Sequence, residues 1–193
     1  MIIGITGASG SGKSIASKCF ENIGYKIVDL DKITHEIYKT DKECVNEVKK
    51  AFGDDVIDQN GDIIRKKLGE LVFLDGEKLN ILNEIVHKYI LKKALKEIKE
   101  VPDVIVDAPL LFEAGLDKLC DITLGIVCDR INNTKRIIER DGISSDLAKS
   151  RLDKQYDDSF FKEKCTFCIE NNGSIEEFLD KIDLFIKNEV TGK

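Results

Sequence analysis

The chain has 193 residues, 42% hydrophobic and 34% charged, and its 36 acidic residues outnumber its 30 basic ones to give a net charge of −6. This composition is typical of a globular domain with a buried core and argues against intrinsic disorder. The acidic balance argues against a protein that coats nucleic acid through bulk charge, and no apolar run approaches the roughly 20 residues of a membrane span. Because Met1 leads directly into an apolar segment without a basic leader, we expect a cytoplasmic protein with no membrane or nucleic-acid partner; a monomer is the default expectation.

A glycine-rich segment follows the first predicted strand, residues 2–5. Residues 7–14 match the pattern G-x-x-x-x-G-K-[ST], and a helical pattern follows until Gly24. Glycines let such a loop wrap a phosphate with its N–H groups pointing inward, while Lys13 would contact the β- and γ-phosphates and the Ser14 hydroxyl would bind Mg²⁺. The residues predicted to bind a nucleoside triphosphate are Ala8, Ser9, Gly10, Ser11, Gly12, Lys13, Ser14 and Ile15.

Two acidic residues, Asp29 and Asp31, lie at the end of the second predicted strand, residues 25–29. Ligands of open parallel sheets bind at the carboxyl ends of the strands, so these acids are candidates for the chemistry. Residues 32–100 then follow a mostly helical pattern that is too long for one crossover helix. We predict a helical insertion that binds the second substrate.

The next apolar strand, residues 104–107, follows a break at Pro102 and ends in Asp107. This arrangement resembles a Walker B element, whose carboxylate orients Mg²⁺ through a water or holds a substrate group; an ordinary strand end is the alternative. Two more strands are predicted over residues 122–127 and 167–169. The sequence therefore predicts an α/β fold of three layers, with five parallel strands between helices.

A charged helical stretch, residues 130–164, lies between the last two strands. Most of its charges are interleaved with acids and indicate a solvated surface. Arg136 and Arg140 are four residues apart on one helix face, as in a lid that swings an arginine onto the transferring phosphate, and we favour Arg140 for this role. After a turn at residues 171–173, Ser174 and Glu177 form a capping box that opens a last helix.

The six cysteines are scattered without the spacing of a disulfide framework, which predicts reduced core residues. Cys165 and Cys168 form a C-x-x-C pair, for which a metal or redox role is the alternative. No second pair lies at zinc-ribbon spacing, and the apolar residues beside Cys168 indicate a buried strand.

Three classes of nucleotide-dependent protein are consistent with the phosphate loop. A small-molecule kinase needs an acid near the acceptor, lid arginines and an acceptor pocket, and the chain offers candidates for each. A GTPase would carry Asn-Lys-x-Asp after a strand, which is missing from this sequence. A motor or binding ATPase would need more partner surface than 193 residues leave, so the motifs favour a kinase.

Motifs along almost the whole chain point to one family. They are the loop with Ile5 and Thr6, Asp-x-Asp at 29–31, Gly-x-x-x-Arg at 61–65 with its continuation to Phe73, Ile-Val-His at 85–87, Asp-Ala-Pro-Leu-Leu-Phe-Glu at 107–113, the arginine helix at 135–141 and Asn-Asn-Gly-Ser at 171–174. In this order they resemble the dephospho-coenzyme A kinase family. Two positions depart from it: Lys88 follows His87 where members often have proline, and Ala8-Ser9 replaces a frequent second glycine, which also resembles uridine-kinase-like sequences. A nucleoside kinase is therefore the alternative.

The resemblance implies ATP- and Mg²⁺-dependent phosphorylation of the ribose 3′-hydroxyl of dephospho-coenzyme A, a small-molecule partner. It implies a nucleotide-binding core at residues 1–31, 101–130 and 165–193, an acceptor-binding insertion at 32–100 and a lid at 131–164. It also implies catalytic roles for Asp31, Lys13 and Arg140, with Ser14 on the metal. The resemblance implies that Thr6, Asp31, Arg65, His87 and Asp107 contact the acceptor, and that Asn171 and Gly173 also contact ATP.

Overall fold

The structure is a computed structural model that describes residues 1–72 and 75–192; Phe73, the end of one family-like segment, lies outside the described residues. The chain forms two compact units. The first comprises Met1–Val28 and Val101–Lys193, and the second comprises Asp29–Glu100.

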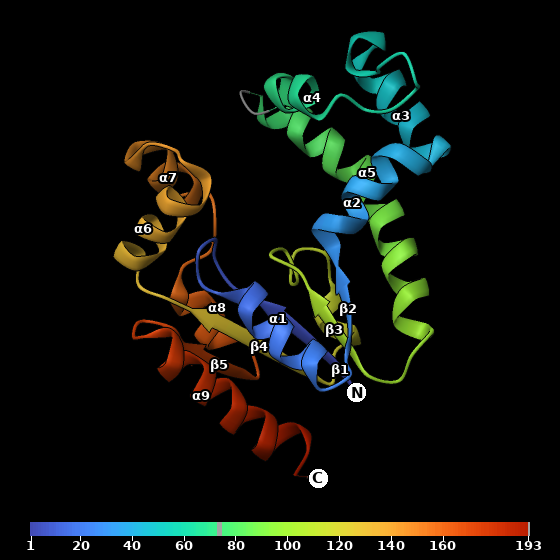
Figure 1. Ribbon diagram of the computed structural model, residues 1–193. Coiled ribbons are helices and arrows are strands. Elements are labelled where there is room, and N and C mark those ends of the chain that lie inside the picture. Colours follow the sequence, from blue (N-terminus) through green and yellow to red (C-terminus); the bar gives the residue numbers. More distant parts are fainter. Residues whose placement is uncertain (73–74, 193) are drawn as a thin grey trace. The chain divides into compact units, whose positions relative to one another are not determined.

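A five-stranded parallel sheet forms the centre of the first unit (Figure 1). Its strands are β1 (Ile2–Thr6), β2 (Lys26–Asp29), β3 (Val104–Asp107), β4 (Ile122–Val127) and β5 (Phe167–Glu170). They lie in the order β2-β3-β1-β4-β5, and Ile5 of β1 pairs with Asp107 of β3 and with Leu124 of β4. The predicted α/β class with five parallel strands is confirmed.

Helices α1 (Lys13–Asn22) and α9 (Ile175–Phe185) cover one face of this sheet (Figure 1). Alternate strand residues such as Ile5 and Leu124 point toward them and form a core with Phe20 of α1 and Phe178 of α9. Because both faces of the strands are covered, they are apolar almost throughout. The predicted capping box at Ser174 and Glu177 is present at the start of α9, which continues into η3 (Ile186–Val190).

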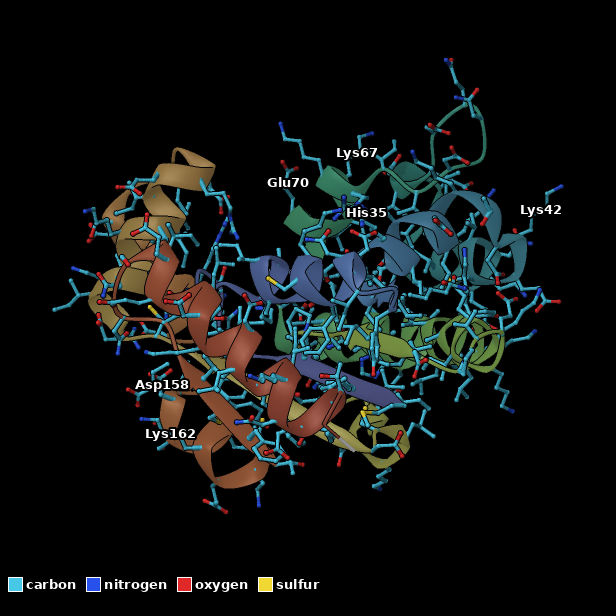
Figure 2. All side chains as sticks on the ribbon, turned by 60° about the horizontal axis from the view of Figure 1, so that its bottom comes forward. His35, Lys42, Lys67, Glu70, Asp158 and Lys162 are labelled. Carbon is cyan, nitrogen blue, oxygen red and sulfur yellow. The ribbon has the colours of Figure 1, made fainter. Side chains whose placement is uncertain are left out.

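The opposite face of the sheet meets α8 (Asp158–Lys164), which carries Asp158 and Lys162 one turn apart (Figure 2). Gly125 of β4 faces this helix, and a Cβ at this position would lie 2.8 Å from Cys168 Sγ and 3.0 Å from Cys165 Sγ. Cys168 donates to the Phe161 carbonyl at 3.3 Å. All six cysteines lie in the described part of the chain as free thiols, as predicted.

The predicted charged stretch before β5 is divided into three helices: α6 (Arg130–Asp141), α7 (Ser145–Leu152) and α8. Gly142, with a φ of 64°, ends α6, and the Ser144 hydroxyl caps α7 by accepting from the Leu147 N–H. Ile137, Leu152 and Phe161, one from each helix, share a cluster of buried side chains with Val127 of β4. A short helix, η2 (Leu116–Leu119), precedes β4.

The second unit is helical. It consists of α2 (Leu30–Thr40), α3 (Lys42–Phe52), η1 (Asp54–Val56), α4 (Arg65–Val72) and α5 (Gly76–Lys99), and α2, α3 and α4 all pack against α5. Aspartates cap three of these helices: Asp29 caps α2, Asp41 caps α3 and Asp75 caps α5. Even the 24-residue α5 is too charged to cross a membrane, and no other described helix is long and apolar enough to do so.

Candidate active site

The phosphate loop connects β1 to α1. Gly12, at the N-cap of α1, has a φ of 109°, and a Cβ there would lie 2.5 Å from Asn171 Nδ2, so only glycine fits. The first turn of α1 contains no acidic residue. The positive end of the helix dipole therefore faces this loop with no acidic side chain of the first turn to offset it, which favours an anion.

Lys13 holds its ammonium over the same loop. Nζ donates to the carbonyl oxygens of Gly7 at 2.8 Å and Ala8 at 3.1 Å. Ser14, the next residue, is exposed. The loop thus combines a helix N-terminus, a fixed cation and an accessible hydroxyl, which suits a polyphosphate and its cation.

A cavity of about 560 Å³ lies beside the loop, a size suited to a small-molecule ligand. Its wall is formed by the loop, the start of α1, the arginine side of α6 and the segment after β5. The lining residues are Gly10, Gly12, Lys13, Ser14, Ile15, Arg136, Glu139, Arg140, Asn171 and Ile175. Six of the residues predicted to bind ATP are thereby brought together at one cavity, with Arg136 and Arg140 of α6.

Asn171 and Arg136 brace the loop from behind. Asn171 is 4% exposed, and its Nδ2 donates to the Ser11 carbonyl at 2.7 Å. Arg136 Nη2 donates to Asn171 O at 3.1 Å, and Nη1 donates to Gly10 O at 3.4 Å. The Arg136 guanidinium therefore joins the loop to the segment after β5.

Arg140 is the more exposed arginine of the cavity, and Asp141 orients it. Arg140 Nε donates to Asp141 Oδ1 at 2.7 Å, and Nη2 donates to Asp141 Oδ2 at 3.0 Å and to Ser9 Oγ at 3.4 Å. Arg151 Nη1 donates to the same Asp141 Oδ2 at 2.7 Å. The hydrogen bonds from Arg140 and the charges of both arginines lower the pKa of Asp141, and Asp141 raises the pKa of Arg140.

Asp107 and Thr6 lie at the carboxyl ends of β3 and β1. Asp107 Oδ2 accepts from Ser17 Oγ at 2.7 Å, which ties the half-buried carboxylate to α1 one turn after Ser14. Thr6 is fully buried, and its hydroxyl donates to Pro109 O at 3.3 Å. Thr6 therefore fixes the segment after β3, so any effect of it on a ligand passes through Pro109.

A second cavity, of about 340 Å³, borders the loop at its beginning. The first two loop residues, the segment after β3 and the segment after α7 form its wall. The lining residues are Gly7, Ala8, Pro109, Leu110, Glu113, Asp153, Lys154, Gln155, Tyr156 and Phe161. Tyr156 stacks on Phe160 with ring centroids 3.7 Å apart, which gives this cavity an aromatic border.

The remaining predicted residues belong to the second unit. Asp31 is exposed in the first turn of α2, whereas the Asp29 carboxylate caps that helix by accepting from the Lys32 N–H at 3.0 Å. Arg65 is exposed at the start of α4 and His87 is half-buried on α5. Burial raises the pKa of Tyr38 to about 12, and the positive charge of Arg65 opposes that shift.

Polar and charged side chains follow the exposed sides of α2 and α4, among them His35, Lys67 and Glu70 (Figure 2). Such a surface suits a polar or charged acceptor better than an apolar one.

A family model described as dephospho-CoA kinase matches residues 1–177. The chain belongs to the dephospho-CoA kinase family.

Relatives and solved structures agree with this membership. A dephospho-CoA kinase of Fusobacterium nucleatum is 42% identical over 187 residues, which cover 96% of each chain. The dephospho-CoA kinase structure from Campylobacter jejuni has a TM-score of 0.75 at 29% identity and covers 99% of this chain and 98% of its own. A crystal structure of a Thermus thermophilus protein has a TM-score of 0.83 at 29% identity, covering 98% of both chains. As a member of the family, the chain is a kinase that transfers phosphate to a hydroxyl acceptor.

The sequence did not predict every feature of this kinase. Gly173 lies in the turn beside Glu177, while Asn171, from the same motif, braces the loop. Gln155 belongs to no motif that the sequence analysis identified, yet its side chain contacts Ser9 of the loop, 146 residues away in the sequence. Only the three-dimensional structure shows this contact, because neither hydrophobic periodicity nor a local motif indicates it.

Proposed function

We propose that the protein transfers the γ-phosphoryl group of ATP to the ribose 3′-hydroxyl of dephospho-coenzyme A and so forms coenzyme A. The observation that carries this proposal is the phosphate loop, where Lys13 lies over Gly7 and Ala8 at the N-terminus of α1 beside a cavity of about 560 Å³. The loop indicates where the phosphates bind, and membership in the dephospho-CoA kinase family indicates which acceptor is phosphorylated.

Lys13 and Arg140 are the proposed catalytic cations. Phosphoryl transfer passes through a loose transition state with charge spread over the phosphoryl oxygens, so positioning and fixed cations contribute most of the catalysis. Lys13 is already held over the loop, and Asp141 orients Arg140 at the cavity wall. ATP would contact the loop residues Ala8 to Ile15, with Asn171 and Gly173 in the segment that closes the cavity.

The hydroxyl in the first turn of α1 and the carboxylate at the end of β3 fit a magnesium ion, for which hydroxyl and carboxylate oxygens are preferred ligands. Ser14 would hold the ion directly, and Asp107, already turned toward α1 by its bond to Ser17, would hold it through a water. A bound Mg²⁺ would neutralise charge on the β- and γ-phosphates.

Asp31 is the proposed group that orients the acceptor hydroxyl. A carboxylate is a weak base at neutral pH, so its main contribution is to hold the hydroxyl in line, with proton loss late in the reaction. Asp29 is committed to capping α2, which supports the choice of Asp31. Arg65 and His87 are the further acceptor contacts proposed in the second unit. Asp107 and, through Pro109, Thr6 are the acceptor contacts proposed in the first unit.

This assignment divides the chain by role. We propose an ATP-binding core at residues 1–31, 101–130 and 165–193, an acceptor-binding insertion at 32–100 and a lid at 131–164. We expect the protein to act as a cytoplasmic monomer on its small-molecule substrates.

An ADP-release assay with ATP and Mg²⁺ tests the proposal. Dephospho-coenzyme A, uridine, cytidine and adenosine are compared at equal concentrations, and the product is identified by mass spectrometry. We expect turnover with dephospho-coenzyme A alone and coenzyme A as product. Turnover confined to a nucleoside would retain the phosphate loop and overturn the acceptor.

A further inference from the structure

One side chain of the predicted lid is hydrogen-bonded to the phosphate loop. Gln155, three residues after α7, accepts from the backbone N–H of Ser9 through Oε1 at 2.8 Å. The hydroxyl of the same Ser9 accepts from Arg140 at 3.4 Å. Ser9, which contacts the proposed catalytic arginine, is thus also held by Gln155.

The chemistry of this contact fixes the orientation of the amide. A backbone N–H can only donate, so the oxygen of the Gln155 amide must face it, and the NH₂ group must face away. Across residues 1–72 and 75–192, this NH₂ group has no hydrogen-bond partner. Two N–H donors are therefore available to a ligand at the loop.

Residues of the loop line both cavities, and Gln155 lines the smaller one. Gly7 and Ala8, whose carbonyls hold the Lys13 ammonium, line the smaller cavity of about 340 Å³ together with Gln155. Lys13 itself lines the larger cavity, which we assign to ATP. Lys13 thus relates the two cavities, because its side chain lines the larger one while its ammonium contacts carbonyls that line the smaller one.

From these contacts we propose that Gln155 is a catalytic residue, which holds the Ser9 N–H through its oxygen and donates from its NH₂ group to the γ-phosphoryl group of ATP during transfer. The proposal rests on the kinase function proposed above. A neutral donor that is anchored before the substrate arrives stabilises the charge of the transition state without the cost of ordering a free side chain. Removal of one such preorganised donor typically costs about 10²-fold or more in kcat.

Two substitutions separate the two halves of the Gln155 amide. Gln155→Glu keeps an oxygen for the Ser9 N–H but has no N–H donor at neutral pH, whereas Gln155→Met keeps the length of the side chain and removes both functions. We expect both variants to lower kcat by about 10²-fold at pH 7.5. For Gln155→Glu, the deficit relative to wild type should shrink as the pH falls toward 5, because a protonated carboxyl can donate again. The deficit of Gln155→Met should not change with pH.

Gln59→Glu is the matched control, since it makes the same chemical change at an exposed position of the second unit. It should leave kcat unchanged. A Gln155→Glu variant with kcat within about threefold of wild type would show that Gln155 only braces the loop, and it would overturn the proposal.

Nucleotide binding provides a second measurement that does not depend on the acceptor. Titration calorimetry should show that Gln155→Met weakens ATP binding by about 10- to 100-fold, the value of one hydrogen bond to a charged group, and leaves ADP binding unchanged. Equal losses for ATP and ADP would contradict a contact with the γ-phosphoryl group. If wild type bound ATP in this way but failed to phosphorylate dephospho-coenzyme A, the proposed acceptor would be wrong while the role of Gln155 at the γ-phosphoryl group would stand.

Discussion

Replacement of Asn171 by alanine should loosen the phosphate loop and lower stability together. Asn171 is 4% exposed, and its Nδ2 donates to Ser11 O at 2.7 Å. The substitution takes away this donor and the side-chain acceptor of Arg136, but Arg136 keeps its bond to the Asn171 carbonyl at 3.1 Å. A buried carbonyl that loses its partner costs about 1–3 kcal/mol, so we expect a loss of about 2 kcal/mol. For a chain of this size, this corresponds to a decrease in Tm of about 4–8 °C.

Thermal unfolding followed by circular dichroism, together with an ATP titration, measures both effects of Asn171→Ala. We expect ATP binding to weaken because the Ser11 segment of the loop is no longer held. Asn172→Ala is the matched control: Asn172 is exposed, and its Oδ1 accepts from the Asp129 N–H at 2.8 Å, where water can replace it. Its loss should stay below about 1 kcal/mol. If Asn171→Ala unfolds like wild type but changes the preference between ATP and GTP, Asn171 contacts the base and the bracing role is refuted.

Three further predictions concern charged residues of the two units. Lys13→Ala should lower kcat by several orders of magnitude with an unchanged circular dichroism spectrum, and near-normal turnover would refute the phosphate-loop assignment. Asp31→Asn should reduce kcat far more than ATP affinity. Asp29→Asn should chiefly lower stability, by about 1 kcal/mol, through the lost cap of α2. A larger loss of kcat for Asp29→Asn than for Asp31→Asn would exchange their roles. The lowered pKa of Asp141 means that its contribution to stability is present above the ordinary carboxyl pKa of about 4 and is lost as the pH falls through its folded value. Asp141→Asn should therefore lower Tm at pH 7 and have progressively less effect below pH 4, and a Tm difference that is constant from pH 7 to pH 3 would contradict this assignment.

The local sequence was sufficient for the elements but not for the contacts between them. The apolar runs at Val104–Asp107 and Ile122–Val127 are strands with the predicted bounds, because burial on both faces of a parallel sheet demands uninterrupted apolar residues. The break at Pro102 and the cap at Ser174 were equally local signals.

The bracing of the loop could not be predicted in this way. Asn171 and Ser11 are 160 residues apart, and Gln155 and Ser9 are 146 apart. Such pairs depend on how the ends of β1, β5 and α7 come together, which hydrophobic periodicity does not encode. The resemblance predicted that Asn171 lies near ATP, and the structure adds that its side chain is bound to the loop itself.

The close packing of Gly125 against Cys165 and Cys168 limits which residues members of this family can carry at these three positions. Any side chain at this position would collide with the sulfurs of Cys165 and Cys168, so the three sites share one small volume between β4 and α8. A larger residue at one of them can be accommodated only if another becomes smaller, and the three positions should therefore co-vary during evolution. Gly125→Ala alone should push α8 away from the sheet and lower the stability of the fold. Adding Cys168→Ala in the same chain should restore much of the lost stability, although neither residue lies at the proposed substrate sites.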